Sequence, residues 1–205
     1  MTQPDLILVI SDLNIPHKVN ELPTHFTELF NQAKLTHVIC LGNIGNKDVY
    51  EYFKSLSKNF YCVKGDCEDE NLVSEFNISD SKTIKVGGFK IGMIHGHQIV
   101  PWGDLYSLSA KRKTLDCDIL LHGFTGISSF YTFEGKHYIN PGTLTSSYSP
   151  INPSPVTAFT VLLIDDDAGV AYKYEQKDIQ KKIEISKIEF KKLAEENYQP
   201  DNDEE

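Results

Sequence analysis

The chain has 205 residues, of which 40% are hydrophobic and 24% are charged, and this ordinary globular composition excludes a disordered chain. Its net charge of −9, from 29 acidic and 20 basic residues, argues against nucleic acid or anionic lipid as a partner, because both are bound through Lys and Arg. The longest apolar run, residues 6–10, is far shorter than the ~20 residues of a membrane span, and the first residues lack the basic flank of a signal peptide. We therefore expect a cytoplasmic protein whose membrane contact is peripheral.

The first part of the chain alternates between strand-like and helix-like segments. Residues 5–12, 36–41 and 60–63 are largely apolar runs with polar or glycine residues at or just after their ends, which is typical of strands buried on both faces. Residues 22–33 and 47–57 place apolar side chains three to four positions apart, which predicts two amphipathic helices. Two strand–helix–strand units in succession predict a parallel sheet with helices on its faces.

The second part of the chain favours hairpins. Two-residue turns at Gly87-Gly88 and Glu134-Gly135 separate short strand-like runs, which predicts two antiparallel pairs. The further expected elements are a helix at 104–115, a strand at 118–121, a third strand pair at 157–164 and 169–174, and a last edge strand at 182–190. We expect one α/β domain over residues 1–191, with mixed sheets and the helices outside.

The end of the chain and the cysteines indicate little chemistry. Residues 195–205 carry six acidic side chains and no basic one, so we expect residues 192–205 to form a solvated, disordered tail. The four cysteines, Cys40, Cys62, Cys67 and Cys117, contain no C-x-x-C pair, and three lie in or beside strand-like runs. Reduced core thiols are therefore expected rather than disulfides or a zinc site.

Polar residues gather where five of the predicted strands end. They are Asp12 and Asn14, Gly42-Asn43, Gly65-Asp66, His95-Gly96-His97 and residues 122–126. Because ligands bind at the carboxyl edge of such sheets, these residues are expected to form one pocket. Carboxylate and imidazole ligands suit divalent ions, and two neighbouring ions would clamp a phosphoryl group for hydrolysis. The alternative is that each residue simply forms a turn or caps a helix.

The order of these motifs resembles the calcineurin-like metallophosphoesterase family, which reads Asp-x-His, Gly-Asp, Gly-Asn-His-Glu, His-Gly-His and Gly-His-x-His. Residues 12–17, 89–104 and 138–142 resemble one branch more closely, the vacuolar protein sorting-associated protein 29 family of retromer subunits. The run His-Gly-His-Gln-Ile-Val-Pro-Trp-Gly-Asp at 95–104 is the most specific part of this match. The resemblance covers residues 5–191 and implies a metallophosphoesterase-like β-sandwich of mixed sheets flanked by helices.

The metal positions that the resemblance implies are degraded. They fall on Asp12, Asn14, Asn43, Asp66, His95, Phe124 and Gly126. Asn14 replaces an imidazole by a neutral amide, and Phe124 and Gly126 offer no ligand atom, so two dications would face only two carboxylates. Cys67 stands where these enzymes carry the histidine that assists the leaving group, and His122 is assigned no ligand role. We therefore expect no cofactor and no catalysis. A single weakly held ion, and a phosphoesterase with a degenerate site, are the alternatives.

Two apolar surfaces are candidate partner sites. Residues 99–102, with the only tryptophan, are either a helix-entry contact or an exposed hot spot. The resemblance favours a hot spot, because in that family this edge and the vestigial pocket seat against a helical solenoid, vacuolar protein sorting-associated protein 35. It assigns this contact to Ile15, Ile99, Val100, Trp102 and Phe124. It also matches a groove for regulators to Leu29, Tyr172 and Tyr174, whereas Leu6 and Val161 fit core packing better.

The sequence thus predicts a non-catalytic scaffold subunit of the retromer endosomal cargo-sorting complex. By the resemblance it binds the solenoid subunit, other retromer subunits and regulators, and it acts in endosome-to-Golgi retrograde transport. It would reach endosomal membranes from the cytoplasm through these partners.

Overall fold

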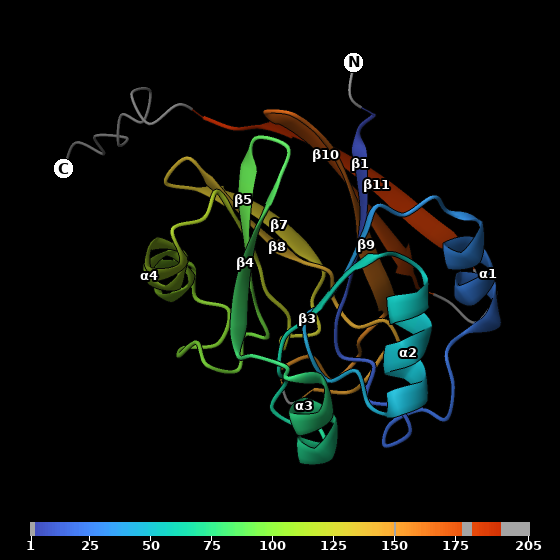
Figure 1. Cartoon of the computed structure of the whole chain (residues 1–205). Coiled ribbons are helices and arrows are strands. Elements are labelled where there is room, and N and C mark those ends of the chain that lie inside the picture. The colour runs from blue at the N-terminus through green and yellow to red at the C-terminus, as the bar shows by residue number, and fades with distance from the viewer. Residues whose placement is uncertain (1–2, 150, 178–181, 194–205) are drawn as a thin grey trace.

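The computed structural model describes residues 3–149, 151–177 and 182–193 (Figure 1). The acidic tail that we expect from residue 192 lies outside the described residues from residue 194 onward. The strands are β1 (Asp5–Ile10), β2 (His37–Cys40), β3 (Asn59–Cys62), β4 (Ser81–Val86), β5 (Phe89–Ile94), β6 (Ile119–Leu121), β7 (Ser129–Phe133), β8 (Lys136–Asn140), β9 (Thr157–Asp165), β10 (Ala168–Gln176) and β11 (Ile183–Lys191). The helices are α1 (Thr24–Gln32), α2 (Lys47–Ser55), α3 (Glu70–Phe76) and α4 (Leu105–Leu115).

The strands form two mixed sheets. One has the order β11-β10-β9-β1-β2-β3 and the other the order β4-β5-β6-β8-β7. Strands β1, β2 and β3 are parallel, with Leu8 opposite Val38 and Val38 opposite Phe60. Strands β5, β6 and β8 are also parallel, whereas β4, β7, β9, β10 and β11 pair antiparallel. The predicted α/β sandwich of mixed sheets is confirmed, and β11 lies at the edge of its sheet as expected.

The sheets pack face to face, with α1 and α2 outside one sheet and α4 outside the other (Figure 1). The layer between the sheets buries Ile7, Ile91 and Leu121 completely. A second apolar layer, which includes Phe26 and Phe53, lies between the six-stranded sheet and its helices. Full burial of side chains of this size is worth ~1.5–3 kcal/mol each, so the sandwich has a core large enough to hold its strand ends in place.

Local signals explain where the helices begin. The side chain of Asn46 accepts a hydrogen bond from the Val49 N–H at 3.0 Å at the start of α2, and Asp104 accepts from the Ser107 N–H at 2.8 Å at the start of α4. Helix α3 is absent from the sequence-based prediction, although Asp69 caps it in the same way. Among the described residues, no helix is long and apolar enough to cross a membrane.

Candidate functional site

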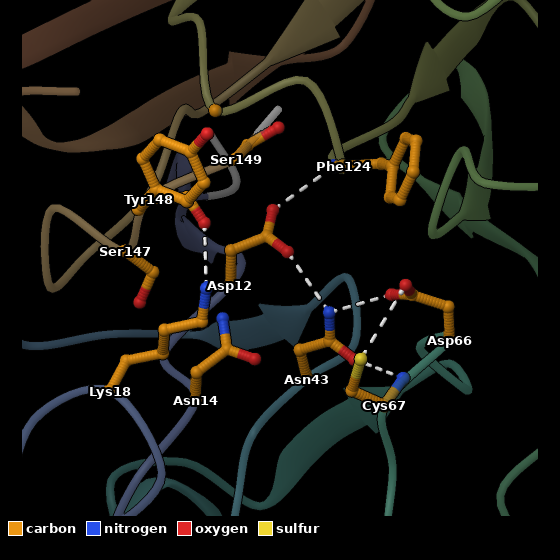
Figure 2. A pocket seen from close by; sticks show the side chains of 11 residues that line it. Asp12, Asn14, Lys18, Asn43, Asp66, Cys67, Phe124, Ser147, Tyr148 and Ser149 are labelled. Atoms are coloured by element: carbon orange, nitrogen blue, oxygen red, sulfur yellow. Dashed lines mark hydrogen bonds between the residues drawn. The ribbon is translucent and has the colours of Figure 1, made fainter. Parts of the chain in front are cut away.

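A small cavity lies where the parallel strands of both sheets end (Figure 2). Its volume is about 150 Å³ and its walls come from loops after β1, β2, β3, β6 and β8. The residues that line it are Asp12, Asn14, Lys18, Asn43, Asp66, Cys67, Phe124, Gly126, Ser147, Tyr148 and Ser149. The structure therefore brings four of the five predicted strand-end motifs to this cavity, and His95 of the fifth contacts two of its lining residues, Asn43 and Asp66.

The side-chain amide of Asn43 lies among the acidic and imidazole groups of this site. Its Nδ2 donates to Asp12 Oδ1 at 3.2 Å and to Asp66 Oδ1 at 2.9 Å, and it lies 3.2 Å from His95 Nε2. The amide oxygen of Asn43 accepts from the Cys67 backbone N–H at 3.0 Å, which fixes the orientation of the amide. One neutral side chain thus contacts the ends of three other strands.

The carboxylate of Asp12 is fully engaged within the protein. Its second oxygen accepts from the Ser11 hydroxyl at 2.9 Å and from the Phe124 backbone N–H at 3.0 Å (Figure 2). The Asp12 carbonyl accepts from the Thr143 hydroxyl at 2.9 Å. Asp12 therefore joins β1 to the loops after β6 and β8, and its side chain is buried.

The imidazole of His95 is the second centre of the cluster and is completely buried. Its Nδ1 donates to the Leu41 carbonyl at 2.5 Å, and its Nε2 lies 3.0 Å from Asp66 Oδ1 and 3.7 Å from Asp12 Oδ1. Burial alone would lower the pKa of His95, but the two carboxylates and the Leu41 carbonyl outweigh it and raise the pKa. The hydrogen bond from His95, helped by Asn43, lowers the pKa of Asp66 in turn.

A buried carboxylate, Glu68, holds the Asn43 loop in place from the other side. It accepts from the backbone N–H groups of Asn43 at 2.7 Å, Ile44 at 3.0 Å and Gly65 at 3.3 Å. Burial raises the pKa of Glu68, and these backbone hydrogen bonds oppose that rise. The sequence analysis gave Glu68 no role, because its partners are backbone groups that only the folded chain brings near it.

Phe124 and Gly126 contribute no ligand atom to this cavity. The Phe124 ring packs edge-on against Trp102, with 5.1 Å between ring centroids, and against His95 at 5.6 Å. Asn14 is half-buried, and its backbone N–H donates to the Asn43 carbonyl at 2.8 Å. The imidazole of His122 is buried, and burial lowers its pKa to about 4. An apolar ring therefore replaces a metal-binding side chain on one wall of the cavity.

The fold family implies a two-metal centre at these strand ends, and the residues present do not fit one. Four of the seven implied positions, Asn14, Asn43, Phe124 and Gly126, lack an imidazole or carboxylate. The acceptor atoms of Asp12 and Asp66 are already bonded to Asn43, His95, Ser11 and the protein backbone. Two dications would have to displace this whole set of hydrogen bonds.

His97 belongs to the cluster as well, as the strand-end motif predicts, although the resemblance does not count it among the metal positions. The ligand atoms of Asp66, His95 and His97 all lie within 4.8 Å of one another. Burial and the neighbouring His95 lower the pKa of His97. Cys67 is the exposed cysteine of the four, and burial together with Asp66 raises the pKa of its thiol. A donor set for at most one ion therefore survives on the His95 side of the site.

The edge beside this cavity carries exposed apolar side chains. Val100 is 75% exposed and Trp102 is 52% exposed. By contrast, Ile15 and Ile99 are 1% and 6% exposed, because they pack in the core beneath the loops. Of the five residues that the sequence assigns to solenoid contact, these two offer no side-chain surface to a partner in this structure. The exposed candidates are Val100 and Trp102, and Phe124 is half-buried with its ring against Trp102.

An apolar cavity of about 190 Å³ lies on the outer face of the six-stranded sheet, beside α1. Leu29, Tyr172 and Tyr174, which the sequence assigns to a regulator groove, all line it. Leu6 and Val161, for which core packing is the preferred interpretation, line it too and are half-buried. Tyr174 stacks on Phe159 beneath it at 4.6 Å. The structure thus places the three predicted groove residues together.

Comparison with known proteins gives one consistent result. Residues 6–166 match the calcineurin-like phosphoesterase superfamily domain. Vacuolar protein sorting-associated protein 29 of Schizosaccharomyces pombe is 31% identical over 193 residues, which covers 91% of this chain and 98% of that protein.

Solved structures agree with this match. Vps29 from Cryptosporidium parvum is 35% identical with a TM-score of 0.88, over 93% of this chain and 100% of that one. Wild-type Vps29 from Entamoeba histolytica, in complex with Zn²⁺, is 33% identical with a TM-score of 0.82, over 90% and 98% of the two chains. In all these cases the similarity extends over nearly the whole length of both proteins.

Proposed function

The chain belongs to the calcineurin-like phosphoesterase superfamily and, within it, to the vacuolar protein sorting-associated protein 29 family, and on this premise we propose that it is a non-catalytic subunit of retromer. In this role it binds the solenoid subunit, vacuolar protein sorting-associated protein 35, and takes part in endosome-to-Golgi retrograde transport. It works from the cytoplasm and reaches endosomal membranes through its partners. Residues 1–191 form the folded unit that carries both binding surfaces.

The observation that carries the proposal is the state of the strand-end cluster. A two-metal phosphoesterase needs open carboxylate and imidazole positions that hold both ions and a metal-bound hydroxide. Here Asn43 donates to Asp12 and Asp66 and lies against His95 Nε2, and Phe124 adds an apolar ring. Cys67 also replaces the histidine that would protonate the leaving group. The fold is retained while the catalytic machinery is not.

The exposed edge next to the cluster supports the solenoid as partner. Aromatic side chains dominate the energetics of protein interfaces, and Trp102 stands half-exposed with the Phe124 ring against it. Val100, which is exposed beside it, adds apolar surface that is costly to leave in water. The edge thus combines a central aromatic pair with an aliphatic neighbour, as a desolvated contact requires.

The second surface supports binding of regulators. Leu29 is 38% exposed and borders the cavity that Tyr172 and Tyr174 line. The cavity is lined by aliphatic and aromatic side chains, with the two tyrosine hydroxyls as polar groups. It lies on the outer face of the six-stranded sheet and shares no lining residue with the strand-end cavity, so a regulator and the solenoid can bind at the same time.

Direct binding tests the proposal. Isothermal titration of the full-length chain with the carboxyl-terminal half of the solenoid subunit should show one-to-one association. The full-length chain with Leu29→Asp should bind the solenoid as the unchanged protein does. Absence of association in both titrations would refute the proposed subunit role.

One observation favours a second function, a metal-dependent phosphoesterase with a degenerate site. Asp66, His95 and His97 hold three ligand atoms within 4.8 Å, and the E. histolytica relative is known in complex with Zn²⁺. Hydrolysis of an aryl phosphate and of a diester, with manganese or zinc, distinguishes the two functions. We expect no rate above that of buffer and metal. Hydrolysis that Asp66→Ala abolishes would establish the phosphoesterase instead.

A further inference from the structure

The amide nitrogen of Asn43 has neighbours of the kind that surround a bound metal ion. It lies 2.9–3.2 Å from an oxygen of Asp12, an oxygen of Asp66 and Nε2 of His95. These three groups come from the loops after β1, β3 and β5, and Asn43 itself follows β2. One amide therefore joins four strand ends from both sheets, as an ion bound between the same groups would do.

The surroundings hold the amide in this position. The Asn43 oxygen accepts from the Cys67 N–H, so the nitrogen must face the carboxylates. Glu68 fixes the Asn43 backbone, and the packing is so close that a Cβ on Gly65 would lie 2.0 Å from the amide oxygen. The backbone of Asn43 is left-handed, with φ of 54°, a conformation that asparagine adopts more readily than most residues.

The distances at this centre are those of hydrogen bonds and not of metal coordination. Zn²⁺ binds carboxylate oxygen and imidazole nitrogen at ~2.0–2.2 Å, whereas N–H···O bonds measure ~2.7–3.2 Å. The three neighbours of the amide lie in the second range. An ion at this centre would need the loops to move inward and the amide to move out.

We propose that Asn43 is a structural substitute for the metal ions of this fold, and that its amide makes the joined strand ends independent of metal. An aspartate at this position has the same shape but no donor, and it adds a third carboxylate to the cluster. Beside the single imidazole of His95, like charges at this distance cannot all remain ionised, so a bound cation would stabilise this variant site. The identity of residue 43 thus decides whether this edge of the sandwich needs metal. This inference is independent of which partner the edge binds.

Thermal unfolding of the full-length chain, in excess EDTA and in millimolar manganese, tests the inference. The unchanged protein should have the same melting temperature in both solutions. Asn43→Asp should melt lower by roughly 10 °C in EDTA and should regain most of this loss with manganese. Asn43→Ala should melt lower in both solutions without regaining stability. Asn20→Asp, which makes the same charge change at an exposed position, should melt as the unchanged protein does in both.

Two results would overturn the proposal. One is an unchanged protein that loses several degrees of melting temperature in EDTA, which would show that its strand ends need metal. The other is an Asn43→Asp protein whose melting temperature does not respond to manganese, whether it is as stable as the unchanged protein or fails to fold in both solutions. An Asn43→Asp protein that folds only when manganese is present supports the proposal.

Discussion

Replacing Val100 with Asp separates the function of the exposed edge from its contribution to the fold. Val100 is 75% exposed, so the free protein gains little from its burial. A surface substitution of this kind changes the free energy of unfolding by ~0.5 kcal/mol or less, which is a shift of ~1–2 °C in a chain of this size. If Val100 were a core residue instead, an aspartate there would unfold the protein.

The expected loss of solenoid binding follows from the same exposure. Full burial of a valine side chain is worth ~1.5–3 kcal/mol, and about three-quarters of that remains available to an interface at this position. An aspartate forfeits this gain of ~1–2 kcal/mol and also buries an unpaired carboxylate, whose desolvation costs several kcal/mol more. The sum is at least ~3 kcal/mol, which corresponds to a Kd at least ~100-fold higher.

Two matched variants make the assay decisive. Ile99 is 6% exposed and packs in the core layer of Leu108 and Tyr138, so Ile99→Asp should lower the melting temperature sharply. Ile185 is 57% exposed on β11, away from the strand-end cavity, so Ile185→Asp should change neither stability nor solenoid binding. The measurements are titration calorimetry with the solenoid's carboxyl-terminal half and thermal unfolding. Solenoid binding by Val100→Asp within threefold of the unchanged protein would refute the role of this edge.

Three further predictions concern ions, pH and a buried ion-pair cluster. Elemental analysis of protein purified without chelator should find no stoichiometric manganese or zinc, and manganese should bind no tighter than about millimolar, or ~4 kcal/mol. One ion per chain at micromolar affinity would show that the cluster still forms a metal site. Burial lowers the pKa of His122 to about 4. Below pH ~6.5 the imidazole therefore becomes protonated in the unfolded chain but stays neutral in the folded chain, and the free energy of unfolding falls by roughly 3 kcal/mol between pH 6.5 and 4. His122→Phe should remove this fall in urea unfolding measured across that range, and an equal pH slope in both proteins would show that His122 is not its source. Asp118 accepts from the Lys90 N–H at 2.9 Å and pairs with Lys136 at 2.8 Å and Lys192 at 3.1 Å. Asp118→Ala should therefore lower the melting temperature by ~5–10 °C, and an unchanged melting temperature would mean that this cluster adds no stability.

The sequence predicts the elements because their signals are local. Apolar runs identify β1, β2 and β3, and the pair Gly87-Gly88 marks the hairpin of β4 and β5. Helix α3 escapes prediction because its seven residues span only two turns, too few for a clear period. Its signal was still present in the cap residue Asp69, followed at once by Glu70 in the first turn.

The site is harder to predict because its interactions are between distant segments. Motif order places Asp12, Asn43 and Asp66 at neighbouring strand ends, and the structure confirms that they meet. The motif alone does not show that Asn43 donates to both carboxylates, since this depends on a hydrogen bond from Cys67 that sets the amide orientation. The exposure of a side chain likewise depends on distant segments of the folded chain and not on the local sequence. Neighbouring Ile99 and Val100 read alike in sequence, yet one is buried in the core and the other is in solvent.

The hydrogen bonds within the strand-end cluster and the proposed docking edge are physically linked through Asp66. Its side chain is 34% exposed, so a partner that covers the edge would remove water from a charged carboxylate. Desolvating a carboxylate is costly unless its hydrogen bonds are met inside the protein. Here His95 and Asn43 already donate to Asp66, and the carboxylate therefore stays charged and paired when water leaves. A two-metal centre would lose metal-bound water on such docking, whereas Asp66 keeps its hydrogen bonds from Asn43 and His95 when the water on its exposed part leaves. On the proposed function, the amide of Asn43 thus reduces the cost of burying this edge against a partner.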